Sequence, residues 1–383
     1  MDTSLQLKNL KTSYIREILA TTQDPKVLSL AGGLPAQELL PVNQLMKSIN
    51  NLERTPEVFQ YGETLGYKPL LEFISQKYQV QNNNSVMVCT GSQQALDLIA
   101  RAYLNTGDKI AVEAPSYLGA LQVFDLARAT ICQIEQNRNG PDLDQLEQVF
   151  SKGDVKLFYT VPDFHNPTGV CWSLETRKSV AAMCLRYGVA LIEDIPYREL
   201  RFSGTELPLV SSFCPENAFV LRSLSKICAP GLRLGMVTAP SNWLAPLIRV
   251  KQASELHTSL PMQAVALDFL SSKEFVTHLK KLRLNYQQRY HVLLNEIEPL
   301  LAEHCHCQAV EGGMFVWLKL IRANAMQVSQ ALLKRNVAVV PGSVFYSESQ
   351  SSQQALRLNF TNCNSAELKL AAERLTEVIK QHS

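Results

Sequence analysis

Short runs of β-forming residues alternate with helix-length segments through the middle of the chain, from about residue 86 to residue 239. Most of the runs are separated by stretches long enough for a helix, such as the helical pattern over 93–104. This alternation is typical of a largely parallel sheet covered by helices on both faces, so the sequence predicts the α/β class. The predicted strands are 86–89, 110–112, 130–134, 156–161, 189–193, 219–223 and 234–239.

The pattern changes after about residue 272, where the strands become fewer. A long charged helix is predicted over 275–297, and the last segment, 365–380, is again helical. A chain of 383 residues is long enough for two domains with a large buried core. We expect a large domain over 45–272 and a discontinuous smaller α+β domain made of 1–44 and 273–383. The strands predicted for the smaller domain are 313–320, 337–340 and 355–360.

Charge and hydropathy argue against several classes of partner. Lys and Arg number 37 and Asp and Glu 35, so the net charge is +2 and gives no reason to expect nucleic acid as a partner. No stretch reaches the roughly 18 uncharged apolar residues that span a bilayer. The first residues carry charges throughout and do not resemble a secretory signal, so neither a membrane nor a secreted location is expected.

The nine cysteines are scattered and form no CxxC pair, which fits a reducing cytoplasm. Their one cluster is the run His304-Cys305-His306-Cys307. Zinc is one interpretation of this run, but ligands so close together cannot all face one ion without distortion, and no second pair stands nearby. The alternative is a helix end that runs into a strand, and we expect no metal site.

Polar side chains follow several of the predicted strands at the point where each strand ends. Asn166 comes after strand 156–161, Asp194 and Tyr197 come at the end of strand 189–193, and Lys226 comes after strand 219–223. Ligands of open parallel sheets bind outside the carboxyl ends of the strands. Thr90-Gly91-Ser92-Gln93 opens a helix after the predicted strand 86–89. Such a turn is either a phosphate site or an ordinary capped turn.

Six motifs stand in a characteristic order along the chain: TGSQQAL, PSYLG, NPTG, EDIPY, SLSKICAPGLRLG and LRLNF. Together they resemble the fold-type-I pyridoxal-phosphate enzymes, specifically the class I/II aminotransferases. AGGLP near the start, with the YIREIL segment before it, resembles the 2-aminoadipate and kynurenine aminotransferase group. The resemblance implies an aspartate-aminotransferase-like fold and the cofactor pyridoxal 5'-phosphate. The implied activity moves an amino group from an L-amino acid to a 2-oxo acid, with 2-oxoglutarate as the expected acceptor.

The resemblance also assigns roles to the strand-end residues. Lys226 matches the lysine that holds the cofactor as a Schiff base and then acts as general base for the α-proton. Asp194 matches the carboxylate that keeps the pyridine nitrogen protonated, and Asn166 and Tyr197 match the donors to the ring's 3-hydroxyl oxygen. Tyr117 matches the ring that stacks on the cofactor. The residues that match the phosphate site are Arg233, Ser225, Ser223, Gly91, Ser92 and Gln93.

Four further residues bear on the substrate and on assembly. Arg357 matches the arginine that grips the substrate α-carboxylate, and Gly33 matches a backbone contact to the same group. Arg16 is either a solvated helix residue or the group that binds a distal carboxylate. Tyr61 is either a core or surface residue or a tyrosine that reaches the phosphate of the neighbouring subunit. The last role implies a homodimer with shared active sites.

Two other activities use the same scaffold. A lyase or decarboxylase shares the lysine, the aspartate and the phosphate site, although Arg357 and the NPTG motif favour transamination. A transcriptional regulator needs a DNA-binding domain, and about 30 residues before Gly33 are too few for one. His165 stands where relatives often carry Gln. Cys228 follows Lys226 closely and is either a reactive thiol or a packing residue.

Overall fold

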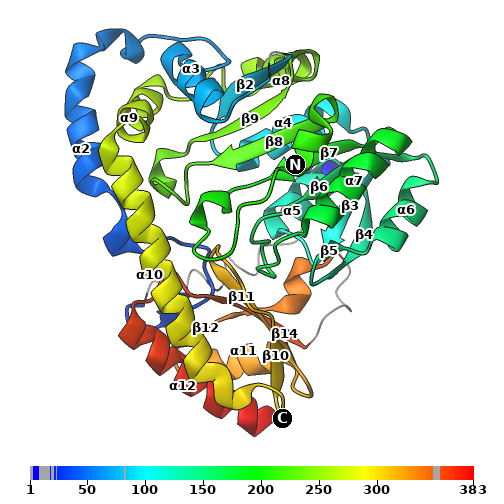
Figure 1. Ribbon diagram of the computed structural model, residues 1–383, viewed down its shortest axis with the longest axis vertical. Helices are drawn as coiled ribbons and strands as arrows, with labels where there is room; N and C mark the ends of the chain where they lie inside the picture. The colour runs from blue at the N-terminus through cyan, green and yellow to red at the C-terminus, as the bar shows by residue number, and fades with distance from the viewer. Residues whose placement is uncertain (1–2, 8–17, 19–20, 23, 82, 348–353) are drawn as a thin grey trace.

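The computed structural model describes residues 3–7, 18, 21–22, 24–81, 83–347 and 354–383. Its centre is an eight-stranded sheet, shown in cyan and green in Figure 1. The sequence prediction of an α/β protein with a mostly parallel central sheet is confirmed. In spatial order the strands are β2 (Asn84–Cys89), β9 (Gly235–Pro240), β8 (Ala218–Ser223), β7 (Ala190–Asp194), β6 (Val155–Thr160), β3 (Lys109–Ala114), β4 (Thr130–Asn137) and β5 (Gly140–Pro141).

Strand direction brings the functional loops to one edge of this sheet. Strands β8, β7, β6, β3 and β4 pair in parallel, whereas β9 is antiparallel to both β8 and β2. The chain between β8 and β9 is too short for a parallel crossover, which explains the reversed direction of β9. Two reversals leave β2 pointing the same way as β8. The carboxyl ends of β2, β3, β6, β7 and β8 therefore meet at the same edge.

Both faces of the large sheet are buried. Leu157 and Tyr159 of β6 pack into one hydrophobic cluster, whereas Phe158 between them packs into another. The first cluster takes residues from α4 and α8, and the second from α6 and α7, so helices cover each face. The helices of this part are α2 (Val42–Asn50), α3 (Lys68–Lys77), α4 (Ser92–Tyr103), α5 (Leu118–Leu126), α6 (Leu143–Phe150), α7 (Leu174–Tyr187), α8 (Ser241–Ser254) and α9 (Leu260–Leu270).

The C-terminal part forms a smaller antiparallel sheet at the lower end of Figure 1. Helix α10 (Lys273–Ile297) runs from the large sheet down to it, and α11 (Ala325–Lys334) and α12 (Ser365–His382) belong to the same part. The predicted helices over 275–297 and 365–380 correspond to α10 and α12. The strand order is β10 (Cys305–Cys307), β11 (Phe315–Leu320), β14 (Ala355–Asn359) and β13 (Val340–Pro341).

The N-terminal segment joins this C-terminal part. Strand β1 (Leu28–Ser29) pairs in parallel with β12 (Val337–Ala338) as a separate two-stranded sheet. This pairing supports the predicted discontinuous small domain, whose boundaries at 44/45 and 272/273 remain predictions. The single strand expected at 337–340 is wrong in detail. The chain leaves β12 at Val339 and continues as β13 in the antiparallel sheet, so two short strands belong to two sheets.

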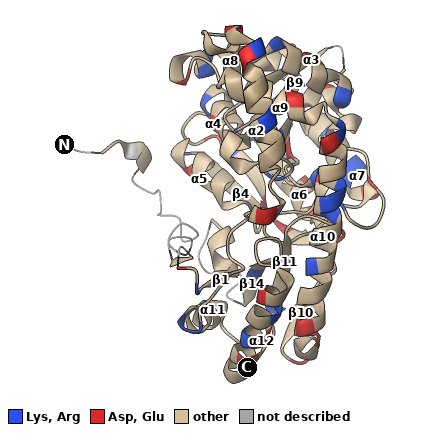
Figure 2. Cartoon of the chain, turned by 90° about the vertical axis from the view of Figure 1, so that its left-hand side faces the viewer, with Lys and Arg blue, Asp and Glu red and all other residues tan. Residues whose placement is uncertain are grey.

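Charged residues of both signs are interspersed over the outer helices in Figure 2. In the described ranges, no helix combines the length and the apolar character that crossing a bilayer requires. The run His304–Cys307 enters β10, where Cys305 is buried and His306 is exposed on the opposite side. No cluster of His, Cys, Asp or Glu in the described part of the chain could hold a metal ion. In this run His304 lies in a turn and the next three residues form β10, and the expected absence of a metal site remains a prediction.

Candidate active site

A cavity of about 300 Å³ lies at the edge where the strands of the large sheet end. Its walls come from the loops after β2, β3, β6, β7 and β8, together with Arg357 of β14 and the loop after β1. Among the predicted site residues that the structure describes, all except Tyr61 line this cavity. The lining residues that the sequence predicted are Gly33, Gly91, Ser92, Gln93, Tyr117, Asn166, Asp194, Tyr197, Ser223, Ser225, Lys226, Arg233 and Arg357.

Lys226 lies in the connection between β8 and β9, and its side chain is directed by one backbone acceptor. Nζ donates a hydrogen bond to the carbonyl oxygen of Gly33 at 2.8 Å. Burial, followed by the positive charges of Arg357 and Arg233, lowers the pKa of Lys226 to about 8. At pH 7 roughly a tenth of this amine is therefore unprotonated, far more than of an ordinary lysine, and a nucleophile or a general base requires that form.

Asp194 ends strand β7 and is buried. Its Oδ2 accepts a hydrogen bond from the hydroxyl of Tyr159 at 3.1 Å. Its Oδ1 is also buried but has no hydrogen-bond partner among the described residues. Burial raises the pKa of Asp194 to about 7, although the Tyr159 hydroxyl opposes that rise. A buried carboxylate oxygen without a partner fits a ligand that brings a positively charged N–H group.

Another wall of the cavity suits a phosphate group. Ser92 is the first residue of α4, so the amide groups of the helix N-terminus face this wall. Gly91 has φ 81°, and a Cβ placed there would lie 2.7 Å from Nη2 of Arg233, so the guanidinium packs directly against the glycine. The amide of Ser225 donates to Oγ of Ser223 at 3.2 Å. Amides, hydroxyls and a guanidinium together provide the donors that a phosphate dianion needs.

An aromatic ring also lines the cavity. Tyr117, just before α5, lines the cavity, and its hydroxyl donates to Oε1 of Gln93 at 3.1 Å. Gln93 in turn donates through Nε2 to the carbonyl oxygen of Gly119 at 2.8 Å. Burial raises the pKa of Tyr117, so the hydroxyl stays neutral and acts as a donor. The bonds to Gln93 hold the ring in place at the cavity wall.

Arg357 of β14 brings a buried positive charge to the cavity from the smaller sheet. Nη1 donates to Oδ1 of Asn166 at 2.8 Å, and Nη2 donates to the carbonyl oxygen of Ala31. The guanidinium lies over the rings of Phe315 and Phe345, with distances of 4.4 and 4.8 Å to the ring centroids. No carboxylate of the described residues forms an ion pair with Arg357, so its charge is available for an anionic ligand.

The sequence profile of the family "Aminotransferase class I and II" matches residues 25–375. The chain belongs to this family. It is 33% identical over 378 residues to 2-aminoadipate transaminase from Thermus thermophilus, covering 97% of this chain and 94% of that protein. It is 34% identical over 389 residues to aromatic-amino-acid aminotransferase 1 from Thermococcus litoralis, covering 97% and 92%.

A solved structure gives the same result for the fold. The crystal structure of Pyrococcus horikoshii kynurenine aminotransferase in complex with PMP superposes on this aminotransferase with a TM-score of 0.94 at 32% identity, covering 99% of this chain and 97% of that one. The enzyme is a pyridoxal-phosphate-dependent aminotransferase. The cavity fits that cofactor, because the unpartnered Oδ1 of Asp194 suits a pyridinium N–H and the Gly91 turn with Arg233 suits its phosphate.

Tyr61 stands apart from the cavity. The Tyr61 side chain is 79% exposed and contacts His257 edge-on, with 5.9 Å between the ring centroids. It therefore belongs to the surface and not to the core, while its proposed reach to a neighbouring subunit remains a prediction. Arg16 lies outside the described residues.

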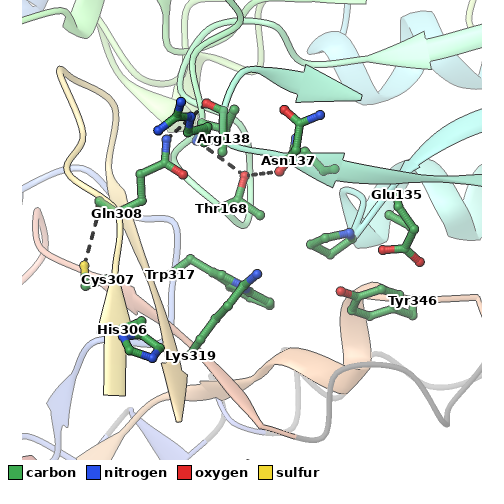
Figure 3. A pocket seen from close by; sticks show the side chains of 14 residues that line it. Glu135, Asn137, Arg138, Thr168, His306, Cys307, Gln308, Trp317, Lys319 and Tyr346 are labelled. Atoms are coloured by element: carbon green, nitrogen blue, oxygen red, sulfur yellow. Dashed lines mark hydrogen bonds between the residues drawn. The ribbon is translucent and has the colours of Figure 1, made fainter. Parts of the chain in front are cut away.

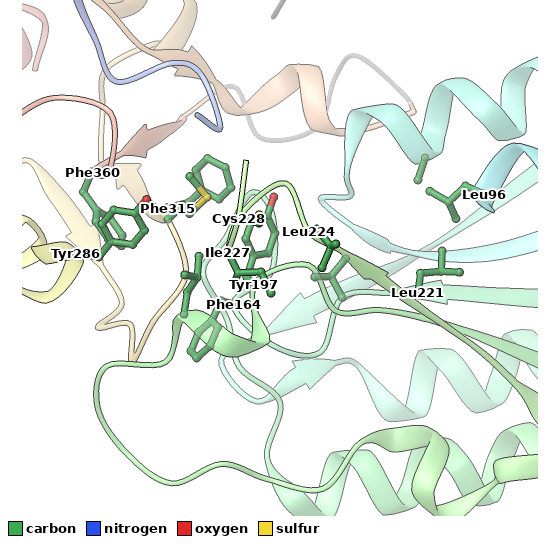
Figure 4. Packing of buried hydrophobic residues seen from close by; sticks show 14 of the residues in the cluster. Leu96, Phe164, Tyr197, Leu221, Leu224, Ile227, Cys228, Tyr286, Phe315 and Phe360 are labelled. Carbon is green, nitrogen blue, oxygen red and sulfur yellow. The ribbon is translucent and has the colours of Figure 1, made fainter. Parts of the chain in front are cut away.

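Cys228 is a packing residue. It is 2% exposed and belongs to the main hydrophobic cluster, which Figure 4 shows together with Ile227 and Phe315. Burial raises the pKa of the Cys228 thiol to about 12, so the reactive thiolate does not form near neutral pH.

A buried polar network that the sequence did not predict supports the Asn166 loop. Oε2 of Glu113 accepts hydrogen bonds from the hydroxyl of Thr160 at 2.5 Å and the amide of Val161 at 3.2 Å, and it lies 3.5 Å from Nε2 of His165. Burial lowers the pKa of His165, although Glu113 opposes this, so the imidazole is neutral. Nδ1 of His165 contacts the hydroxyl of Thr168 at 3.1 Å, within the loop that carries Asn166.

The other side of this loop borders a second cavity of about 370 Å³ (Figure 3). Thr168 and Trp317 line it, whereas Asn166 and Arg357 line the first cavity, and the two cavities share no lining residue.

The residues of the first cavity that the sequence did not predict are Leu34, Tyr159, Val161 and Pro196. Pro196 lies within the EDIPY motif and Val161 ends the predicted strand 156–161, whereas Tyr159 lies inside that strand, where periodicity does not show that it reaches the site.

Proposed function

We propose that this aminotransferase transfers the amino group of an L-amino acid to 2-oxoglutarate, with the cavity around Lys226 as its active site. One observation carries the proposal. Three side chains line the same cavity: the partly unprotonated Lys226, the buried Asp194 with a free oxygen, and the buried Arg357, which no carboxylate pairs. Lys226 provides an amine for covalent and proton chemistry, Asp194 a partner for the ring cation, and Arg357 a receptor for the substrate carboxylate.

The chemistry divides between the cofactor and the side chains. Bound pyridoxal phosphate supplies an electron-withdrawing ring that stabilises negative charge at the substrate α-carbon. Asp194 holds a proton on the ring nitrogen through its free Oδ1. Nζ of Lys226 would take the proton from the substrate α-carbon and pass it to the cofactor carbon that bears the transferred nitrogen, and the bond to the Gly33 carbonyl keeps the amine at the cavity wall when it is free.

Arg357 and Asn166 orient the amino acid. Arg357 binds the α-carboxylate through its planar fork, and the Phe315 and Phe345 rings hold the guanidinium in plane. The amide of Asn166 and the hydroxyl of Tyr197 lie 3.4 Å apart, and both would donate hydrogen bonds to the oxygen on the cofactor ring. Fixing the carboxylate and the ring together presents the α-hydrogen to Lys226.

The substrate class is inferred from the relatives and from one further arginine. The similar proteins are named for 2-aminoadipate, which carries a second carboxylate, and for aromatic amino acids. We infer that Arg16 binds the distal carboxylate of 2-oxoglutarate, as the resemblance implies. An Arg16→Ala variant is expected to slow the half-reaction with 2-oxoglutarate and to leave the half-reaction with aromatic donors unchanged. If both half-reactions of the variant keep their wild-type rates, the role of Arg16 is contradicted.

Tyr61 supports a homodimer. Its side chain is 79% exposed, as is expected of a residue that serves a neighbouring subunit and not its own cavity. We propose that it reaches the partner's phosphate site, so each active site is shared. We also propose a cytoplasmic location, because all nine cysteines are free of disulfides.

A panel of amino donors tested against 2-oxoglutarate and pyruvate is the decisive experiment. Stoichiometric conversion of the bound cofactor to its amine form by a donor, with return by an oxo acid, is the expected result. Release of ammonia or carbon dioxide instead would show a lyase or a decarboxylase on the same scaffold.

A further inference from the structure

Tyr159 contacts the candidate catalytic machinery from inside the sheet. It lies on β6, next to β7, which carries Asp194, and its side chain is 1% exposed. Its hydroxyl donates to Oδ2 of Asp194 at 3.1 Å. Phe124 packs edge-on against its ring, with 5.8 Å between the centroids. The sheet and this aromatic contact hold the hydroxyl in one place.

The bond from Tyr159 makes the two oxygens of Asp194 unequal. Oδ2 is occupied by the hydroxyl, whereas Oδ1 is buried and has no partner among the described residues. A carboxylate held at one oxygen cannot rotate freely about its terminal torsion, so the free oxygen keeps a fixed direction. A donor at Oδ2 also stabilises the charged form against burial.

We propose that Tyr159 is a positioning residue that aims Oδ1 of Asp194 at the ring nitrogen of the cofactor and favours the ionised form of the carboxylate. This inference rests on the proposed placement of the cofactor ring against Asp194. It assigns Tyr159 no contact with the substrate. Removing the Tyr159 hydroxyl should therefore matter only when the cofactor has a ring nitrogen. If Tyr159 were merely structural, the loss would not depend on that nitrogen.

The experiment compares two cofactors on apoenzyme reconstituted in solution. One is pyridoxal 5'-phosphate, and the other is its analogue in which a carbon replaces the ring nitrogen. Tyr159→Phe removes one hydroxyl. It is expected to weaken binding of pyridoxal phosphate about tenfold, since hydrogen bonds to charged groups are among the stronger ones in proteins. Binding of the carbon analogue is expected to change less than about twofold.

A matched control removes a hydroxyl elsewhere in the same domain. Tyr103 donates to the carbonyl oxygen of Trp243 at 2.8 Å and does not line the cavity. Tyr103→Phe is expected to leave both cofactor affinities unchanged. With saturating cofactor, Tyr159→Phe is expected to lower kcat while the KM of the amino donor stays the same, because Arg357 is untouched.

The outcomes separate this inference from the proposed site. If Tyr159→Phe weakens both cofactors equally, the residue is structural and the inference is overturned. If the wild type itself binds the two cofactors equally well, and Asp194→Asn does not change this, the placement of Asp194 is wrong. If the wild type discriminates and Tyr159→Phe discriminates as well as the wild type, only the role of Tyr159 is overturned.

Discussion

Arg357 donates a hydrogen bond from Nη1 to Oδ1 of Asn166 across 2.8 Å, although the two residues are 191 positions apart in the chain. Arg357 belongs to the small antiparallel sheet, whereas Asn166 lies in a loop at the edge of the large one. The bond therefore joins the proposed carboxylate receptor directly to a residue that we place against the cofactor. Any relative movement of the two sheets changes both contacts together.

Arg357→Lys is expected to raise the KM of the amino donor and lower kcat/KM roughly 10- to 100-fold, because lysine keeps the charge but loses the fork that binds a carboxylate and Asn166 together. Half-reaction rates measured against donor concentration test this. Arg138→Lys is the control, since Arg138 lines the neighbouring cavity. An unchanged kcat/KM in Arg357→Lys would place the substrate carboxylate elsewhere.

Lys226→Ala is expected to abolish the visible absorbance of lysine-bound cofactor and to reduce turnover at least about 10³-fold, because the variant lacks both the covalent anchor and the general base. Absorbance spectra and steady-state assays on the purified variant measure these effects. Lys178→Ala removes an exposed lysine, whose side chain is 51% accessible, and should behave as wild type. A Lys226→Ala protein that keeps the absorbance band would show that another lysine binds the cofactor.

Motif order was enough to predict which residues line the cavity, because Lys226, Asp194 and Asn166 follow strands whose ends must meet at one edge. The faces of a strand buried on both sides cannot be told apart in this way. Leu157, Phe158 and Tyr159 are all apolar or aromatic, so the sequence does not show which of them points toward Asp194.

Contacts between segments that are distant in the chain could not be predicted from the sequence either. Glu113 and His165 lie 3.5 Å apart in the core, but nothing in either local sequence indicates the other. The split of 337–340 into β12 and β13 depends on which neighbouring strands are present, and not on its own residues. Local propensity finds the strand, and tertiary pairing decides its sheet.

The apoenzyme should lose stability relative to Asp194→Asn as the pH rises. Burial raises the pKa of Asp194 from 3.8 to about 7, so between these pH values the folded apoenzyme keeps a proton that the unfolded chain has lost. The free energy of unfolding therefore falls with rising pH through this window and levels off above it. Asparagine does not titrate. Melting temperatures of both apoproteins from pH 4 to 8 should diverge, and parallel curves would contradict the raised pKa.

Mixed dimers test the shared site. Lys226→Ala and Tyr61→Ala homodimers are each expected to be nearly inactive, but a heterodimer places both changes in one of its two sites and leaves the other intact. Random reassociation of equal amounts should restore about a quarter of the wild-type activity, because half of the dimers are mixed and each has one intact site. No recovery after reassociation would show that Tyr61 does not serve the partner.

Gly91→Ala tests the phosphate wall. Gly91 and Gly107 have φ 81° and 88°, so alanine strains the backbone at both positions by about 1 kcal/mol. A Cβ at Gly91 would lie 2.7 Å from Nη2 of Arg233, whereas a Cβ at Gly107 would have nothing within 4 Å. Both variants should therefore melt at a lower temperature. Only Gly91→Ala should also weaken cofactor binding, by about tenfold or more, because it displaces the guanidinium from the phosphate site. Equal cofactor affinities in the two variants would mean that Arg233 does not bind the phosphate.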